Sequence, residues 1–253
     1  MSNRMSSSKK LSRKYNASVV AQKLVSKAIF DHSMIASGDR ILIAVSGGKD
    51  STVLAMMLSL LRPALKVDYH LAGLHISTDF CSCCKKPELI NHLASWGIPF
   101  EDIYVPVIAR LKAGRKMNCY WCSTQRRAEL ISYALNHNFN KIALGHHLDD
   151  SIETYFMNIT AAGKLCGMPA LLQYEKYPLV LIRPLSYLEE RQVVACADEH
   201  GLLKSACTCP YGKNSQRIMM RKKIAELCGG SGAVKRRIIQ AFNEEALCRT
   251  KLN

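Results

Sequence analysis

The chain has 253 residues, of which 48% are hydrophobic, so it is long enough and apolar enough to bury a full core. No run of about 18 apolar residues occurs and the polar N-terminus lacks the apolar stretch of a signal peptide, so we expect a cytoplasmic protein with no membrane contact. The formal net charge of +15 exceeds what solubility requires and predicts a polyanionic partner.

The predicted elements begin with a flexible basic N-terminus over residues 1–15 and a helix over 17–36, which ends at Ser37 and Gly38. Elements then alternate: strand 40–45, helix 50–62, strand 66–75, helix 86–96, strand 99–105, helix 122–137, strand 141–145 and helix 150–160. This alternation is typical of a parallel twisted sheet with helices on both faces, the α/β class. A short strand near 178–183, a helix over 188–200 and two basic helices complete the prediction.

These elements predict an α/β domain over residues 16–185 and a helical, cysteine-bearing region over 186–253. Basic residues gather in four segments, which are "SSSKKLSRK" near the N-terminus, 110–116, 217–223 and 235–237. Such clusters pair with phosphates along a nucleic acid backbone. We therefore expect the C-terminal helices to contact a nucleic acid.

The segment "ILIAVSGGKDST" joins an apolar strand to a helix through Ser46, Gly47 and Gly48, and the helix opens with Lys49, Asp50 and Ser51. Unpaired N–H groups and the positive end of the helix dipole converge at such a turn, so it predicts a phosphate site. A Walker A loop would need a glycine at Ile43 and a hydroxyl residue at Asp50. A dinucleotide fingerprint would need three spread glycines, whereas this turn has two adjacent ones.

Two other strand ends carry polar residues, namely "LHIS" at 74–77 with His75 and "GHHLDD" at 145–150 with Gly145, His146 and Asp150. Ligands of parallel sheets bind beyond the carboxyl ends of the strands, so we expect these segments and the glycine turn to face one crevice. Asp150 is the candidate for proton handling or for holding a reactive base. Helix capping by Asp149 or Asp150 is the alternative, and His146 and His147 could equally be structural.

Eleven cysteines in a cytoplasmic chain point to metal or redox chemistry rather than disulfides. Cys119 and Cys122 form a Cys-x-x-Cys pair directly before a predicted helix, where both thiolates can reach one metal. The other clusters are Cys207 with Cys209, in a loop, and Cys81, Cys83 and Cys84. The isolated thiols, expected to be buried, are Cys166, Cys196, Cys228 and Cys248.

Ligands from two loops would build either a closed zinc site or an iron–sulfur cluster, and spacing alone does not choose between them. Arg126 and Arg127 lie one turn beyond Cys122, where they could hold phosphate or an anionic cluster, or form a solvated helix face. Arg183, before Pro184, is a candidate phosphate contact.

The Ser-Gly-Gly-x-Asp-Ser turn resembles that of the PP-loop ATP pyrophosphatase superfamily. The segments "NCYWCSTQRR", "KIALGHHLDDSIETYFMN", "GKLCGMPA" and "LVLIRPLSYLEE" follow in the order and spacing of its tRNA 2-thiocytidine synthetase family, over residues 16–227. The resemblance implies an adenine nucleotide alpha hydrolase-like fold and ATP-dependent thiolation of C2 of a pyrimidine in tRNA. It also implies Mg²⁺, a [4Fe-4S] cluster, a sulfur donor such as a cysteine desulfurase, and a homodimer.

Carried over residue by residue, the resemblance assigns catalysis to Asp150, Asp50 and Lys49, and the cluster to Cys119, Cys122 and Cys209, with Cys207 as the alternative third ligand. The implied ATP site comprises Ser46, Gly47, Gly48, Lys49, Asp50, Ser51, His75, Gly145, His146 and Arg183. Arg126 and Arg127 would contact RNA or the cluster.

Two features depart from related families. The N-terminus lacks the cysteines and histidines of the zinc module that 2-thiouridine synthetases usually carry, which favours cytidine as the substrate base, and "CSCC" at 81–84 is not expected from the family. The alternatives are a 2-thiouridine synthetase, an ammonia-using amide ligase with the same phosphate loop, and a non-catalytic RNA-binding protein with structural zinc.

Overall fold

The computed structural model describes residues 3–80, 87–202 and 216–250, with side chains over 17–80, 87–202 and 216–242. The strands are β1 (Asp39–Ala44), β2 (Tyr69–Thr78), β3 (Phe100–Val105), β4 (Lys141–Ala143), β5 (Leu171–Gln173) and β6 (Val180–Ile182). The helices are α1 (Asn3–Asp31), α2 (Lys49–Leu60), α3 (Arg62–Leu65), α4 (Pro87–Ser95), α5 (Cys119–Asn136), α6 (Leu148–Ala162), α7 (Glu190–Glu199), α8 (Gln216–Cys228) and α9 (Gly232–Thr250).

The strands form one sheet in the order β3-β2-β1-β4-β6-β5. All neighbouring pairs are parallel except β5 with β6, and in the centre Ile41 of β1 lies opposite Leu71 of β2 and Lys141 of β4. The first three strands lie side by side in the order β1, β2, β3, and the next strand, β4, pairs with the other side of β1. The strand order thus reverses between β1 and β4, where open α/β sheets form a ligand crevice.

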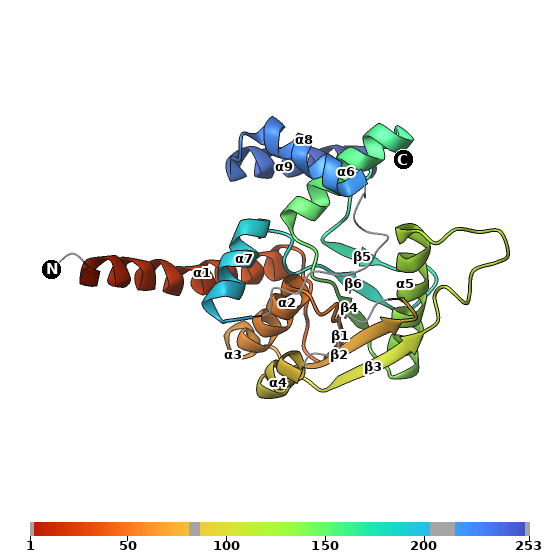
Figure 1. Ribbon diagram of the computed structural model, residues 1–253, viewed down its shortest axis with the longest axis horizontal. Coiled ribbons are helices and arrows are strands. Elements are labelled where there is room, and N and C mark those ends of the chain that lie inside the picture. Colours follow the sequence, from red (N-terminus) through yellow and green to blue (C-terminus); the bar gives the residue numbers. More distant parts are fainter. Residues whose placement is uncertain (1–2, 81–86, 203–215, 251–253) are drawn as a thin grey trace.

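Helices cover both faces of this sheet (Figure 1). Ile41 and Ile43 of β1 are fully buried beneath α1, α2, α4 and α7, and the alternate residue Leu42 packs on the other face against α5. Residues 51–58 of α2 are all buried, which makes α2 the central helix of the larger core. A strand apolar on both sides is expected when both faces of a parallel sheet are covered.

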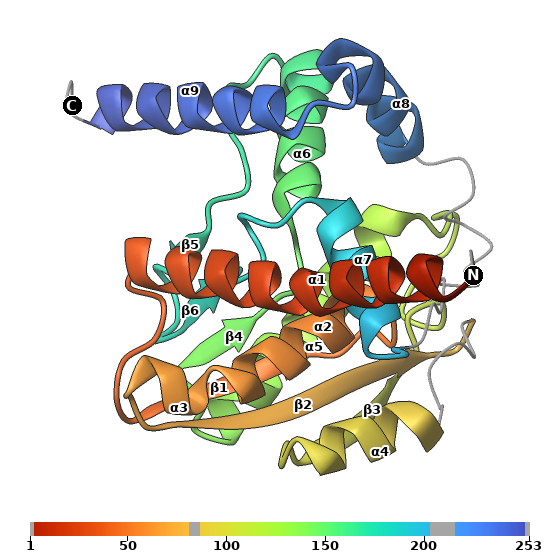
Figure 2. The same ribbon diagram turned by 90° about the vertical axis from the view of Figure 1, so that its left-hand side faces the viewer.

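A separate helical layer stands beyond one edge of the sheet (Figures 1 and 2), where α8 and α9 pack on α6. Its small core contains Leu148 and Ile152 of α6 and Ile224 and Cys228 of α8. The rings of Tyr155 and Phe242 stack with centroids 3.6 Å apart, so α9 is attached to α6 through an aromatic contact as well.

The predicted fold class is confirmed, and most element boundaries agree to within a few residues. The first helix starts at Asn3 rather than 17, because its polar N-terminal part contains no glycine or proline to end it. The helix predicted over 50–62 is two helices, α2 and α3, with Pro63 in the first turn of α3. Strand β5 and its antiparallel pairing were not predicted, since three residues carry too little pattern.

The pair Cys119 and Cys122 lies within the first turn of α5 rather than directly before it. Asn118 adopts an extended conformation and its side-chain oxygen accepts a hydrogen bond from the Trp121 N–H at 2.8 Å, which makes it the N-cap. None of the helices in the described part of the chain is long and apolar enough to cross a membrane.

Candidate functional site

The turn between β1 and α2 is held by its own side chains. The Ser51 hydroxyl accepts a hydrogen bond from the Ser46 N–H at 3.1 Å, donates to the Gly48 carbonyl at 3.0 Å, and lies 3.0 Å from the Ser46 hydroxyl. Gly47 has φ +78°, a conformation that side chains disfavour, and Gly48 caps α2 with no side chain. The first N–H groups of α2 therefore remain available for an anion.

Gly145 at the end of β4 touches this turn. A Cβ atom at Gly145 would lie 3.0 Å from the carbonyl carbon of Asp50 and 3.0 Å from the amide nitrogen of Ser51. Both atoms are backbone, so they cannot move aside without shifting the start of α2. The position requires glycine for steric reasons, and the contact fixes the two strand ends against each other.

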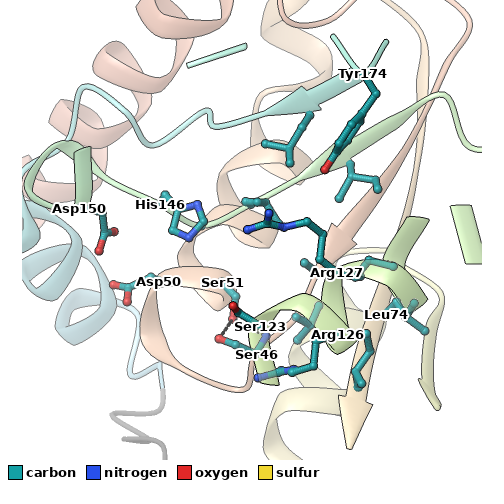
Figure 3. A pocket seen from close by; sticks show the side chains of 18 residues that line it. Ser46, Asp50, Ser51, Leu74, Ser123, Arg126, Arg127, His146, Asp150 and Tyr174 are labelled. Carbon is teal, nitrogen blue, oxygen red and sulfur yellow. Dashed lines mark hydrogen bonds between the residues drawn. The ribbon is translucent and has the colours of Figure 1, made fainter. Parts of the chain in front are cut away.

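A cavity of about 350 Å³ opens at the switch point between β1 and β4, within the range of about 300–1,000 Å³ usual for small-molecule sites (Figure 3). Its apolar wall consists of Ala44, Val45, Leu74, Ile76, Leu130, Ile142, Leu144, Tyr174 and Leu181. Its remaining lining is Gly145 and the polar residues Ser46, Asp50, Ser51, Ser123, Arg126, Arg127, His146 and Asp150. The three strand ends expected to face one crevice therefore do so.

The polar groups separate by charge. Figure 3 shows Asp50 and Asp150 on one side of His146, and Arg126 and Arg127 on the other side, toward α5. Ser123, Arg126 and Arg127 share one face of α5, since residues three and four apart on a helix lie together. The cavity can thus place anionic groups of a ligand toward α5 while keeping carboxylates at the opposite end.

His146 is held as a neutral ring. Burial lowers the pKa of His146 from 6.5 to about 4. The guanidinium of Arg183 donates to Nδ1 of His146 at 3.3 Å, which requires an unprotonated Nδ1 and leaves the proton on Nε2. His146 therefore presents a neutral hydrogen-bond donor at the cavity.

Asp150 lies in the cavity lining and also takes part in the capping of α6, which was the alternative to a chemical role. As the third residue of α6 it accepts the His147 N–H at 3.0 Å in a capping box. Its other oxygen accepts from Arg217 of α8 at 3.0 Å, and Arg217 also donates to the Thr154 hydroxyl at 3.3 Å. The carboxylate is thereby fixed from two directions.

Five predicted ATP contacts lie outside the lining of the cavity, namely Gly47 and Gly48 of the turn and the side chains of Lys49, His75 and Arg183. The Lys49 ammonium lies 3.0 Å from an Asp50 oxygen and 3.3 Å from Glu190; burial opposes its charge, but these carboxylates outweigh it and raise its pKa. His75 is 1% exposed and its Nδ1 lies 2.6 Å from the Val45 carbonyl. Arg183 lies behind His146 and also donates to the Pro169 carbonyl.

The paired cysteines lie beside this cavity. Cys119 is exposed, whereas Cys122 is half-buried and packs in a cluster with Ile76, whose side chain also lines the cavity. Within the described ranges, no three Cys, His, Asp or Glu side chains meet as a metal site. The candidate third ligands Cys207 and Cys209 lie outside these ranges, as do Cys81, Cys83 and Cys84.

The isolated cysteines behave differently from one another. Cys196 and Cys228 are buried as expected, and burial raises the pKa of Cys196 to about 12, so this thiol is unreactive. The expectation was wrong for Cys166, which is exposed in the loop after α6, because Gly163 ends the helix. The side chain of Cys248 lies outside the described set.

An ion-pair cluster joins the helical layer to the sheet domain, and we name it the α6–α9 cluster. Its acids are Asp149, Asp150, Glu153, Glu189 and Glu190, and its cations are Arg217, Arg221, Lys235 and Arg236. Glu153 and Glu189 are each 1% exposed. Sequence reasoning named none of these pairs, and it also missed Ser123 and Tyr174, although the helical spacing of Ser123 from Arg126 and Arg127 was a usable signal.

Residues 16–227 match the PP-loop domain family. A tRNA-cytidine(32) 2-sulfurtransferase from Dichelobacter nodosus is 35% identical over 208 residues, covering 80% of this chain and 77% of that protein. The corresponding protein of Geobacter metallireducens is 34% identical, covering 86% of each.

Among solved structures, the U34-tRNA thiolase NcsA from Methanococcus maripaludis, with its [4Fe-4S] cluster, shares the fold with a TM-score of 0.75 at 21% identity, covering 91% of this chain and 79% of that one. The glycine turn, the cavity at the switch point and the extent of these matches agree. The chain belongs to the PP-loop family and, within it, to the family of the tRNA-cytidine(32) 2-sulfurtransferases.

Proposed function

We propose that this chain is an ATP-dependent tRNA 2-sulfurtransferase that replaces the C2 oxygen of a cytidine in the anticodon loop with sulfur. The single observation that supports this most is that one helix, α5, carries both the cysteine pair and part of the cavity lining. Its first turn carries Cys119 and Cys122, and its next turns carry Ser123, Arg126 and Arg127 in the lining of the cavity. A thiolate pair and a nucleotide-sized cavity thus adjoin one another, as sulfur transfer to an activated base requires.

ATP fits the cavity in one orientation. The apolar wall, with Leu74, Ile76 and Tyr174, suits the adenine and ribose, and the N–H groups at the start of α2 suit the phosphates. Arg126 and Arg127 add positive charge on the α5 side. The carboxylates of Asp50 and Asp150 are ligands that Mg²⁺ prefers, so this end could hold the ion that neutralises the phosphates, although both Asp50 oxygens also contact the Lys49 ammonium, at 3.0 and 3.4 Å.

The first chemical step converts a poor leaving group into a good one. The C2 oxygen of the base attacks the α phosphorus of ATP, so an O–P bond forms and the bond to pyrophosphate breaks. Charge then develops on the departing pyrophosphate, and the fixed N–H groups of the Ser46–Ser51 turn stabilise it without reorganising. The neutral Nε2–H of His146 can donate to a phosphate oxygen, since Arg183 occupies the other ring nitrogen.

The second step adds sulfur at C2 and breaks the C2–O bond, so AMP leaves with the original oxygen. Asp150 is fixed at the cavity, where it can hold the base and accept the proton that the attacking hydrosulfide loses. The sulfur that adds is at the sulfide level, so a persulfide donor such as a cysteine desulfurase also requires a thiol that reduces the persulfide and is itself oxidised to a disulfide.

The chain's thiols fit a metal cluster at this position. Cys119 and Cys122 lie three residues apart on one helix face, and Cys209 or Cys207 would supply the third ligand. A [4Fe-4S] cluster held by these cysteines would supply the sulfide for the second step. Four thiolates around zinc would supply only structure, and the sulfur would then travel as a persulfide on a cysteine.

The test is thiolation of an anticodon stem-loop RNA by protein purified without oxygen, with iron, sulfide, AMP and pyrophosphate measured together. We expect about four irons per chain, lost in Cys119→Ala and Cys122→Ala, and 2-thiocytidine formed with one AMP per sulfur. Asp50→Ala should bind RNA but form no product. A 2-thiouridine product would favour the uridine-specific alternative, and an active Asp50→Ala protein would exclude the assigned nucleotide site.

A further inference from the structure

The connection between β3 and α5, residues 106–118, projects from the body of the molecule beside α5 (Figure 1). It joins the carboxyl end of a strand to the start of a helix, so it leaves the same edge of the sheet at which the cavity opens. We name these residues the α5 loop. Its sequence "PVIARLKAGRKMN" contains Arg110, Lys112, Arg115 and Lys116 and no acidic residue.

The base of the α5 loop is firmly attached. The carboxylate of Asp79 accepts the N–H groups of Ile108 at 2.9 Å and Ala109 at 3.1 Å. The indole of Trp121 donates to the carbonyl of Val107 at 3.0 Å, and Val107 is fully buried. These contacts fix where the loop starts and returns, at the edge of the sheet where the cavity opens.

The cations of this loop are directed to solvent. Arg110 pairs with Glu129 of α5, but Lys112, Arg115 and Lys116 are exposed and form no ion pair with any residue in the described part of the chain. Four basic residues of α8 and α9 face carboxylates instead, namely Arg217, Arg221, Lys235 and Arg236, whereas Lys222, Lys223 and Arg237 are exposed like the cations of the loop. The loop differs from these last three in its place, because it leaves the edge of the sheet at which the cavity opens. With no ion-pair partner among the described residues, its three exposed cations can take phosphates without breaking an ion pair.

An exposed aromatic ring follows the loop directly. Tyr120 is 81% exposed, and it lies in the sequence between Cys119 and Cys122 at the start of α5. Single-stranded RNA bases stack on exposed aromatic rings, and phosphates bind cations beside them. A protein partner would be expected to meet acidic as well as basic groups, and the loop has none.

We propose that the α5 loop and Tyr120 form the RNA-binding surface of this enzyme. Lys112, Arg115 and Lys116 contact phosphates of a single-stranded RNA loop, and Tyr120 stacks on an unstacked base next to the one that enters the cavity. This inference rests on the proposed function, whose substrate it locates. It assigns the α5 loop, rather than the C-terminal helices, as the main phosphate contact.

The experiment compares two triple variants that remove equal charge from exposed cations. One is Lys112→Gln, Arg115→Gln, Lys116→Gln, and the control is Lys222→Gln, Lys223→Gln, Arg237→Gln on α8 and α9, where these side chains are also exposed. Affinity for a fluorescent anticodon stem-loop RNA is measured without ATP at several salt concentrations. The loop variant should lose affinity by roughly 100-fold at about 0.1 M salt, with the salt slope reduced by about 2.

The control variant should stay within about threefold of the unmodified protein. If it loses as much as the loop variant, or if the loop variant binds normally, the α5 loop is not the RNA surface. The measurement needs no turnover, so such a result leaves thiolation standing. An unmodified protein that binds no RNA would instead reject the proposed function itself.

Tyr120 is tested by Tyr120→Ala against Tyr120→Phe, with iron content measured in both because the neighbouring cysteines are candidate ligands. Loss of stacking should weaken RNA binding roughly tenfold in the alanine variant, while phenylalanine keeps the ring and the affinity. Equal affinity of all three proteins with equal iron would show that no base stacks on Tyr120.

Discussion

The two sides of the crevice both carry many basic residues but use them in opposite ways. On the side of α8 and α9, four cations pair with acids of α6 and α7, two of which, Glu153 and Glu189, are almost completely buried. On the side of α5, Arg126 and Arg127 line the cavity and the α5 loop carries exposed cations. Similar composition therefore forms internal ion pairs on one side, whereas on the other side it leaves cations in the cavity lining or exposed to solvent.

The different use of basic residues on the two sides shows that net charge alone does not locate a nucleic-acid surface. The two basic C-terminal helices were the expected RNA contact, yet the positive charge that faces the α6–α9 cluster is neutralised by carboxylates. The relevant quantity is the number of cations that lack an acidic neighbour and also lie at the edge of the sheet where the cavity opens. Variants on each side test this difference.

The largest effect is expected for Arg217, the cation of the α6–α9 cluster that contacts Asp150 in the cavity lining. Arg217→Met removes the hydrogen bond that fixes Asp150, and misplacement of a reacting group by about 1 Å can cost on the order of 100-fold in rate. We expect kcat for thiolation to fall by that factor, with RNA affinity unchanged. Arg217→Lys should recover little, because lysine cannot bind Asp150 and Thr154 together.

Arg221→Met is the matched control, since Arg221 lies one turn further along α8 and pairs with Glu153 instead. Its kcat should stay within a few-fold of the unmodified enzyme. Equal losses of kcat in both variants would mean that the cluster supports the site only through overall folding.

The second prediction is that removing either partner of the Arg221–Glu153 ion pair lowers stability, but by unequal amounts. Arg221→Met leaves the Glu153 carboxylate buried without its main partner, and burial already raises the pKa of Glu153, so we expect the free energy of unfolding to fall by about 3 kcal/mol. Glu153→Met leaves only a half-exposed arginine that water can solvate, so the loss should be about 1 kcal/mol. Urea denaturation measures both, and equal losses would contradict the burial argument.

The third prediction concerns Gly145, at the end of β4, which touches the backbone of the glycine turn. Gly145→Ala forces a Cβ against the backbone of Asp50 and Ser51, and overpacking of this kind costs roughly 2 kcal/mol. The shifted turn should also bind ATP more weakly in equilibrium binding measurements. Gly73→Ala is the control, because its Cβ would meet the side chains of Val45 and Phe100, which can adjust without moving the turn.

The smallest effect is a pH dependence at the centre of the cavity. Since the pKa of His146 is lowered to about 4 in the folded protein, its contribution to stability is complete above pH 6.5 and is lost as the pH falls toward 4. Between pH 7 and pH 5.5 we expect a loss of about 1 kcal/mol from this residue. His146→Gln should lack that part of the decline; an unchanged pH profile would mean that His146 titrates normally.

Local patterns were sufficient for much of the fold and for the core of the candidate site. The strand from 40 to 45 and the glycine turn are contiguous, and their meaning follows from spacing and backbone chemistry. The start of α5 was also readable, because asparagine is a preferred N-cap and Asn118 stands directly before the helix. The helix was nevertheless predicted to begin at residue 122, three residues later than it does.

Contacts between distant segments could not be read in this way. Arg183 and His146 are 37 residues apart, and Arg217 and Asp150 are 67 apart, so neither pair forms a local pattern. The direction of Lys49 toward Glu190 likewise depends on where α7 packs. Such placements follow from packing of the whole chain, which a periodicity or a motif does not contain.

The long separation between Arg217 and Asp150 also bears on how the enzyme is made. During synthesis the N-terminal part folds first, so the glycine turn and α6 can assemble before α8 leaves the ribosome. At that stage the acids of α6 have no cations to face, and the carboxylate of Asp150 has only its capping contact. An unfinished chain can therefore form the glycine turn while Asp150 still lacks the Arg217 contact that fixes it, because this contact forms only after α8 has been synthesised.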